Sequence, residues 1–143
     1  MSKVSIVYWS GTGNTEAMAG YIAEGVKAAG KEAELVFVSD ANIAELQSAA
    51  AFALGCPSMG AEQLEESEME PFMEGLEGNI AGKQIVLFGS YGWGNQEWMR
   101  DWEERIRQAG ATVVNDEGIA VNGAPEGDVI EQLKDAGRAL ANF

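Results

Sequence analysis

The chain has 143 residues, a length typical of one domain, and its 23 acidic and 9 basic side chains give a formal net charge of −14. Such a surface repels phosphate backbones and anionic lipid, so we expect no nucleic-acid or membrane partner and favour a protein partner with a basic surface. Histidine is absent and Cys56 is the single cysteine, which excludes a disulfide, an iron–sulfur cluster and the commonest general base. Any catalysis must therefore come from a cofactor. An acidic coat that serves only solubility would explain much of the same charge.

The beginning of the chain carries an apolar run only at residues 4–9, which is too short for a secretion signal. No stretch approaches the ~20 apolar residues of a membrane helix, so we expect a cytoplasmic protein. Cys56 adjoins the apolar run 51–55, and a small buried side chain is a better interpretation of it than a reactive thiol.

Short apolar runs alternate with helical patterns along the whole chain. In chain order we predict a strand at 4–9, a helix at 15–29, a strand at 35–38, a short helix at 42–47, a strand at 51–55, a helix at 68–76, a strand at 84–88, a helix at 96–108, a strand made of 112–114 and 119–121 with an interruption at 115–118, and a helix at 128–140. Strands that alternate with helices predict an α/β fold, here one doubly wound domain over residues 1–143. Its five-stranded parallel sheet would be covered by helices on both faces, as the nearly continuous apolar strands also indicate.

The loop after the first predicted strand has the composition of a phosphate cradle. Its six residues are Ser10, Gly11, Thr12, Gly13, Asn14 and Thr15, and they lead directly into a predicted helix. Hydroxyl and amide groups, glycines that allow close backbone approach, and the free N–H groups of a helix N-terminus together stabilise an anion. A helix cap with a glycine turn is the alternative, but it needs only one such residue.

Two other kinds of phosphate loop do not match this segment. A P-loop needs Gly-Lys-Ser/Thr, and no lysine occurs between Val4 and Val26. A dinucleotide-binding fingerprint would need a glycine at position 16, where the chain has Glu16. The cradle therefore suits a mononucleotide phosphate that is held without a cation, a metal or a pyrophosphate.

Two further loops present large apolar side chains that regular secondary structure does not explain. Met59 follows the strand at 51–55, and Trp93 stands between two glycines after the strand at 84–88. We interpret these two side chains as jaws around a flat ring, with core packing as the alternative for Trp93. Trp98 and Trp102 lie one helical turn apart and indicate a helix face on the sheet, although Trp98 could touch the rim of the cofactor.

These three loops, in register, strongly resemble those of the flavodoxins, and most closely those of the short-chain type from anaerobic bacteria. The resemblance rests on residues 7–16, 55–60 and 87–94, and it extends over nearly the whole chain. The chain leaves no room for the extra loop that long-chain members insert in strand five. The resemblance implies strand order 2-1-3-4-5, with flavin mononucleotide (FMN) bound where the winding direction reverses.

The resemblance also implies a role for individual residues. Met59 would cover one face of the isoalloxazine ring and Trp93 the other, Glu62 would accept a hydrogen bond from the flavin N3–H, and the Gly60 carbonyl would turn toward N5 in the semiquinone. The full set of implied FMN-binding residues is Ser10, Gly11, Thr12, Gly13, Asn14 and Thr15 for the phosphate, Pro57, Ser58, Met59, Gly60, Ala61 and Glu62 in the second loop, Ser90, Tyr91, Gly92, Trp93, Gly94 and Trp98 around the third, and Asn122 and Gly123 at the pyrimidine edge.

Ala61 departs from the family pattern, which usually places Gly, Asn or Asp at that position. A Gly60 carbonyl that points toward N5 resembles a type II turn, which requires φ > 0 at the third residue. We therefore expect strain at Ala61 in the semiquinone, and a higher oxidised/semiquinone potential in Ala61→Gly.

The function implied is that of a low-potential one-electron carrier, not an enzyme, which uses the semiquinone/hydroquinone couple of FMN. Seven glutamates and no lysine or arginine lie between Pro57 and Gly82, so we expect this rim to lower the second potential and to attract basic redox proteins for transient docking. We expect a monomer. An FMN-dependent NAD(P)H:quinone oxidoreductase is the alternative, and a signalling receiver, which needs an aspartate where this chain has Gly55-Cys56, is a weaker one.

Overall fold

The computed structural model describes residues 3–143. Its elements are β1 (Lys3–Tyr8), α1 (Asn14–Ala28), β2 (Glu32–Phe37), η1 (Val38–Asp40), α2 (Ile43–Ser48), β3 (Ala51–Gly55), α3 (Met69–Leu76), η2 (Glu77–Asn79), β4 (Gln84–Tyr91), α4 (Glu97–Gln108), β5 (Thr112–Val113), η3 (Val114–Asp116), β6 (Ile119–Asn122) and α5 (Asp128–Ala141). Within residues 3–143, no helix combines the length and the apolar character that crossing a membrane requires.

The strands form one parallel sheet in the order β2-β1-β3-β4-β5, which confirms the predicted order. Ile6 in β1 lies opposite Leu35 in β2 and Ala53 in β3, so the chain winds outward from β1 in both directions. The loops that leave the carboxyl ends of β1 and β3 therefore diverge. In sheets of this kind, ligands bind in the space between such loops.

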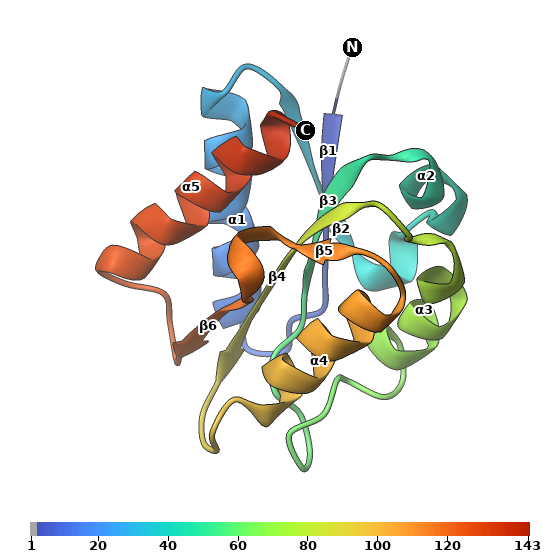
Figure 1. Ribbon diagram of the computed structural model, residues 1–143. Helices are drawn as coiled ribbons and strands as arrows, with labels where there is room; N and C mark the ends of the chain where they lie inside the picture. Colours follow the sequence, from blue (N-terminus) through green and yellow to red (C-terminus); the bar gives the residue numbers. More distant parts are fainter. Residues whose placement is uncertain (1–2) are drawn as a thin grey trace.

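Helices cover both faces of the sheet, as predicted. Figure 1 shows α1 and α5 together on one face and α2, α3 and α4 on the other. Successive strand residues point to opposite faces, so Ile6 packs in the core under α1 and α5, whereas Val7 packs in the core under α3 and α4. The strand β3 is buried along its whole length, which explains its uninterrupted apolar sequence.

The predicted fifth strand is two strands, so the sheet has six strands in all. β5 and β6 both pair with β4, and η3 separates them. Two residues of η3, Asn115 and Asp116, have φ of 65° and 68°, a left-handed conformation that a strand does not contain. β4 is also longer than predicted, because β6 pairs with Ser90 and Tyr91 beyond the apolar run.

Candidate functional site

A cavity of about 350 Å³ lies among the loops at the carboxyl ends of β1, β3, β4 and β6. Its volume falls within the ~300–1,000 Å³ of small-molecule and cofactor sites. The structure thus brings together residues that the sequence places in four separate loops. The residues that line the cavity are Trp9, Ser10, Gly11, Thr12, Asn14, Thr15, Pro57, Ser58, Met59, Ser90, Tyr91, Gly92 and Gly123.

The cradle between β1 and α1 has the geometry of an anion site. The Ser10 hydroxyl accepts hydrogen bonds from the N–H of Gly13, at 3.2 Å, and of Glu16, at 3.3 Å, which closes the loop on itself. No acceptor within residues 3–143 takes the backbone N–H of Thr12, Asn14 or Thr15. These unpaired donors at the positive end of α1 fit a phosphate.

Gly13 makes this arrangement of the cradle possible. It precedes α1 with a φ of 101° and has no side chain to cap the helix; Ser10 takes the N–H of Glu16, and those of Asn14 and Thr15 remain open to a ligand. A residue with a Cβ atom is strained in that conformation. The alternative of an ordinary Asn or Thr cap is therefore wrong, because Gly13 is the capping residue and Asn14 and Thr15 lie inside the helix.

The two predicted jaws differ in how the protein holds them. Met59 is half-buried and lines the cavity, whereas Trp93 is 62% exposed on the loop between β4 and α4. Core packing of Trp93 is excluded by this exposure. Stacking of Trp93 on a flat ligand stays a prediction, because its side chain does not line the cavity in this conformation.

Two other aromatic side chains, Trp9 and Tyr91, do line the cavity. Trp9 is the last residue of the apolar run 4–9, a pattern typical of a core residue, but its indole is half-buried and its Nε1 donates to Glu68 Oε1 at 3.2 Å. This contact turns the ring across the cradle, where a Cβ atom on Gly11 would lie 3.1 Å from it. The position of Trp9 at the exact end of the apolar run was the available signal.

The turn that follows Met59 is closed by two backbone hydrogen bonds. Met59 and Gln63 exchange N–H···O=C bonds of 2.8 Å in both directions, which leaves Gly60, Ala61 and Glu62 at the tip. Gly60 and Glu62 have φ of 52° and 55°, while Ala61 is outside the left-handed region. The left-handed residues of this conformation are thus the neighbours of Ala61, and its strain in a flipped turn stays a prediction.

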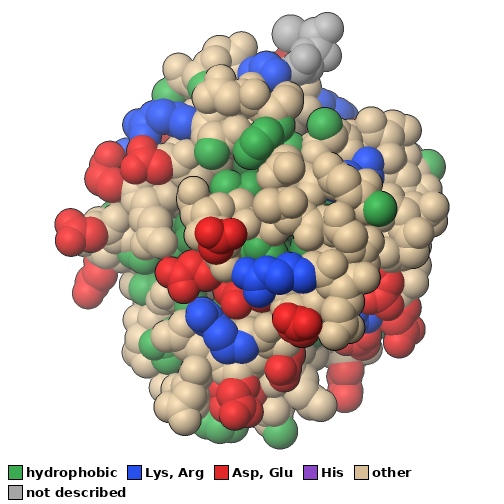
Figure 2. Space-filling model, viewed as in Figure 1, with side chains coloured by type: hydrophobic (Ala, Val, Ile, Leu, Met, Phe, Trp, Pro, Cys, Tyr) green, Lys and Arg blue, Asp and Glu red, His purple; other side chains and the backbone are tan. Residues whose placement is uncertain are grey.

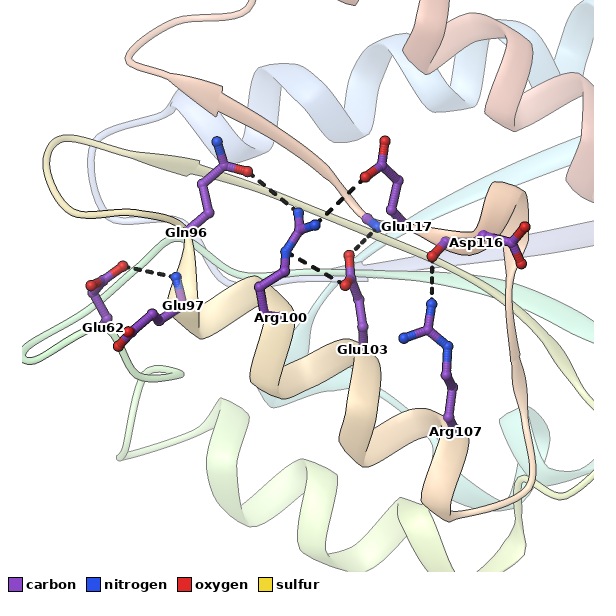
Figure 3. Close-up of polar contacts among 9 residues, drawn as sticks. Glu62, Gln96, Glu97, Arg100, Glu103, Arg107, Asp116 and Glu117 are labelled. Carbon is purple, nitrogen blue, oxygen red and sulfur yellow. Dashed lines mark hydrogen bonds and ion pairs between the residues drawn. The ribbon is translucent and has the colours of Figure 1, made fainter.

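Glu62 links this turn to the loop after β4. Its Oε1 accepts a hydrogen bond of 2.9 Å from the N–H of Glu97, the first residue of α4 (Figure 3). A Cβ atom on Gly94 would lie 2.5 Å from the Glu62 carboxyl carbon, so Gly94 leaves the space that the carboxylate fills. The predicted bond from flavin N3–H would have to share this carboxylate with α4.

The floor of the cavity is a network of hydrogen bonds between loops. The buried Thr15 Oγ1 accepts from the Ser90 N–H at 3.4 Å, and the Ser90 hydroxyl donates to the Gly123 carbonyl at 2.6 Å. The Gly123 N–H donates to the Tyr91 carbonyl at 2.9 Å, and the exposed Asn122 precedes it at the end of β6. Ser90 and Gly123 therefore hold three of the loops at fixed separations.

Trp98 is a buried residue that contacts the backbone at the end of β3. Its indole is 1% exposed and donates from Nε1 to the Cys56 carbonyl at 2.9 Å. This burial leaves no indole surface for a ligand, so the helix-face interpretation holds and the contact with a cofactor rim does not. Cys56 is buried as predicted, and burial raises the pKa of its thiol to about 12, which keeps it protonated and inert.

Glu65 is a structural residue, whereas the sequence indicated only that it belongs to the acidic segment between Pro57 and Gly82. It is 7% exposed, and its carboxylate accepts from the N–H groups of Ser67, Glu68 and Met69 at 2.9, 2.8 and 3.0 Å. Burial alone would raise the pKa of Glu65, but these three donors lower it below the ordinary value. Glu65 thus caps α3 and fixes the end of the loop between β3 and α3, which contains Met59.

Replacement of Glu65 by glutamine should lower the free energy of unfolding at neutral pH by about 1–3 kcal/mol, because a neutral amide accepts weaker hydrogen bonds. A lowered folded-state pKa gives a contribution that is fully present above the ordinary value of 4.5 and is lost as the pH falls through the folded-state value. Urea unfolding of the variant at neutral pH and at about pH 3 tests this prediction. Glu66→Gln, which changes an exposed neighbour, is the control. An equal loss at both pH values would contradict a charge-dependent cap.

A second cavity, of about 310 Å³, lies between β2 and α2. Glu34, Asp40 and Glu45 line it, and it has no open helix N-terminus comparable to that of α1. Carboxylates repel a phosphate, so this cavity does not fit an anionic ligand. The cavity at the carboxyl ends of the strands is the one whose chemistry matches the sequence prediction.

Comparison with known proteins agrees with this geometry. The family model described as Flavodoxin matches residues 6–137. The chain is 48% identical to a flavodoxin of Clostridium beijerinckii, over 98% of this chain and 100% of the relative, and 50% identical to a flavodoxin of Megasphaera elsdenii, over 96% and 98%. The solution structure of the two-electron reduced Megasphaera elsdenii flavodoxin superposes with a TM-score of 0.88 over 98% of this chain and 99% of that one. With its phosphate cradle, strand order and loops all in place, the chain belongs to the flavodoxin family.

Proposed function

We propose that this chain carries single electrons at low potential between proteins, on one FMN bound in the cavity at the carboxyl ends of β1, β3, β4 and β6. Its family and its relatives support the class of function, an FMN-binding electron carrier and not an enzyme. The observation that carries the proposal is the open N-terminus of α1, whose unpaired N–H groups face a cavity of cofactor size.

The residues present fit FMN in two respects. Thr12, Asn14 and Thr15 would hold the phosphate through backbone N–H and side-chain groups, without a cation. Met59 and the exposed Trp93 would enclose the ring, and bound FMN would supply the capacity to accept and release electrons one at a time. The protein's part is to hold that ring, to exclude water from one side of it and to set the charge around it.

The surface near the site is acidic. On the lower half of the face in Figure 2, where Figure 1 places α4 and the loops beside it, acidic side chains outnumber the basic ones that lie among them. A carboxylate ~10 Å from a negative charge opposes it by roughly 1.7 kcal/mol at an effective dielectric near 20. Such a field disfavours addition of a second electron to FMN, and it attracts a basic redox partner into a small transient interface.

The choice of carboxylates decides whether this charge effect can be tested cleanly. Simultaneous neutralisation of Glu65, Glu66 and Glu68 would remove three charges of the acidic segment, but Glu65 caps α3 and Glu68 accepts a hydrogen bond from Trp9. That triple variant would therefore disturb the fold. Glu66 and the side chain of Glu97 are exposed and are better suited to the purpose.

Neutralisation of these two residues, as Glu66→Gln with Glu97→Gln, should raise the more negative one-electron potential of bound FMN by roughly tens of millivolts, and more at low salt. A redox titration at two ionic strengths measures the shift. Glu32→Gln is the matched control, since Glu32 is exposed at the amino end of β2, away from the loops of the site. An equal shift of the potential in Glu32→Gln, or no shift in the double variant at low salt, would refute a contribution of Glu66 and Glu97 to the potential.

Replacement of the exposed Trp93 by alanine should weaken the binding of oxidised FMN, because a stacked aromatic pair is lost. The loss should be about 0.5–1.5 kcal/mol beyond that expected from the buried area. Flavin fluorescence that the indole quenches should return in the same variant. Trp93→Phe keeps a ring at the position and should retain most of the affinity. Bound flavin that is equally dark in Trp93→Ala would argue against stacking.

A further inference from the structure

The chain leaves the sheet after β5 and pairs with β4 again at β6, so pairing is not continuous between the two strands. Val113 is the last β5 residue and lies opposite Ile85, while Ile119 is the first β6 residue and lies opposite Phe88. The chain thus advances by six residues (113 to 119) against three in β4 (85 to 88). The residue at which pairing resumes matters, because a slip of one residue would move every β6 side chain to the other face.

A buried carboxylate on α4 contacts the chain at the point where pairing resumes. Glu103 is 3% exposed, and its Oε2 accepts the N–H of Gly118 at 2.6 Å, directly before β6. Arg100 lies over it, with Nε 3.6 Å from Glu103 Oε1 and Nη1 3.5 Å from Glu117 Oε2 (Figure 3). The carboxylate therefore has a backbone donor and a positive charge, the partners that a buried anion requires.

The backbone of Gly118 packs tightly between α4 and the sheet, which fixes its distance from the helix. A Cβ atom there would lie 2.3 Å from Met99 Sδ and 3.2 Å from Leu87 Cβ, so the backbone of Gly118 touches both the helix and the sheet. One turn beyond Glu103, Arg107 donates to the carbonyl of Asp116, a residue in the left-handed conformation. These contacts hold the segment between the two strands in its middle, at Asp116, and at its last residue, Gly118.

We infer that Glu103 is a positioning residue, which sets where β6 begins and thereby where the Asn122-Gly123 backbone meets the cavity. The four residues that follow Gly118 form the extended strand β6 and end at Asn122, so a fixed start gives a fixed end. Gly123 lines the cavity and bonds to Ser90 and Tyr91. The consequence for FMN binding rests on the proposed function; the consequence for β6 does not.

Amide hydrogen exchange on the full chain without FMN tests the position of β6 directly. In Glu103→Ala, the amides of residues 119–123 should exchange at least about tenfold faster than in wild type, because their anchor is lost. Glu103→Gln keeps an oxygen for the Gly118 N–H and should stay near wild type. Glu103→Asp withdraws the carboxylate by about 1.5 Å and should resemble alanine, which provides a second variant should alanine fail to fold.

Arg105→Ala is the matched control, because Arg105 lies on the same helix but pairs with Glu70 and Glu77 instead. It should leave the exchange of residues 119–123 at the wild-type rate. FMN affinity should follow the same order, with Glu103→Ala weaker by about tenfold and Glu103→Gln within about threefold of wild type. A wild-type chain that bound no FMN would refute the proposed function, while the exchange rates would still decide the positioning of β6.

Two results would overturn the inference. Unchanged exchange at residues 119–123 in both Glu103→Ala and Glu103→Asp would show that pairing with β4 positions β6 unaided. Equal acceleration in Arg105→Ala would show that any loss of polar contacts on α4 has the same effect, and that Glu103 acts only through general stability.

Discussion

FMN should bind to Thr12→Ala and to Asn14→Ala more weakly than to the wild-type chain, by about 1–3 kcal/mol in each case. Both side chains line the cavity beside N–H groups that have no acceptor within residues 3–143. The cradle contains no lysine or arginine, so each polar group that is removed leaves phosphate charge without compensation. Fluorescence titration of the FMN-free variants measures the loss.

Riboflavin, which lacks the phosphate, separates an effect on the cradle from an effect on the ring. Its affinity should be about a hundredfold or more below that of FMN in the wild type, and the two variants should leave it unchanged. Asn42→Ala is the matched control, because Asn42 caps α2 with a 3.1 Å bond to the Glu45 N–H, away from the cavity. Equal affinities for FMN and riboflavin in the wild type would rule out this phosphate site.

A methyl group on either of two glycines between α1 and α5 should destabilise the fold by about 3 kcal/mol. A Cβ atom on Gly25 would lie 1.9 Å from the Lys134 carbonyl oxygen, and one on Gly137 would lie 2.0 Å from the Ile22 carbonyl oxygen. Both obstacles are backbone atoms of the facing helix, so the helices must separate and lose contacts along their whole interface. Urea unfolding of Gly25→Ala and Gly137→Ala measures the cost.

Gly20 provides the matched control on α1. No heavy atom lies within 4 Å of the place its Cβ would occupy, so Gly20→Ala gains helix propensity without a clash. It should stabilise the protein by about 0.5–1 kcal/mol. A Gly25→Ala variant as stable as Gly20→Ala would mean that α1 and α5 can move apart at little cost.

Local patterns predicted the elements and the α/β class, whereas the strand order was implied by the resemblance to the flavodoxins. Apolar runs and helical periodicity defined the elements, and the residue types of the loop at 10–15 indicated phosphate binding, which stays a prediction. The interruption of the last strand at 115–118 was predicted as well, but the structure that forms it was not. It depends on the left-handed Asn115 and Asp116 and on contacts from α4, and these appear only in three dimensions.

The contacts that the sequence did not reveal are those between side chains and a distant backbone. Glu62 reaches the N-terminus of α4, and Glu103 reaches Gly118, across 35 and 15 residues of chain respectively. Glu103 nevertheless left a signal, since it lies on the same face of α4 as the buried Trp98, Trp102 and Ile106. A carboxylate on an apolar helix face requires a partner, and this position therefore called for one.

A reductive titration of the purified chain after it has been loaded with FMN tests the central claim most directly. The account predicts one FMN per chain, reduced in two separate one-electron steps, with the second step at the more negative potential because of the acidic surroundings. A chain that retains no FMN, or whose FMN is reduced in a single two-electron step, would contradict the assignment of this protein as a carrier of single electrons.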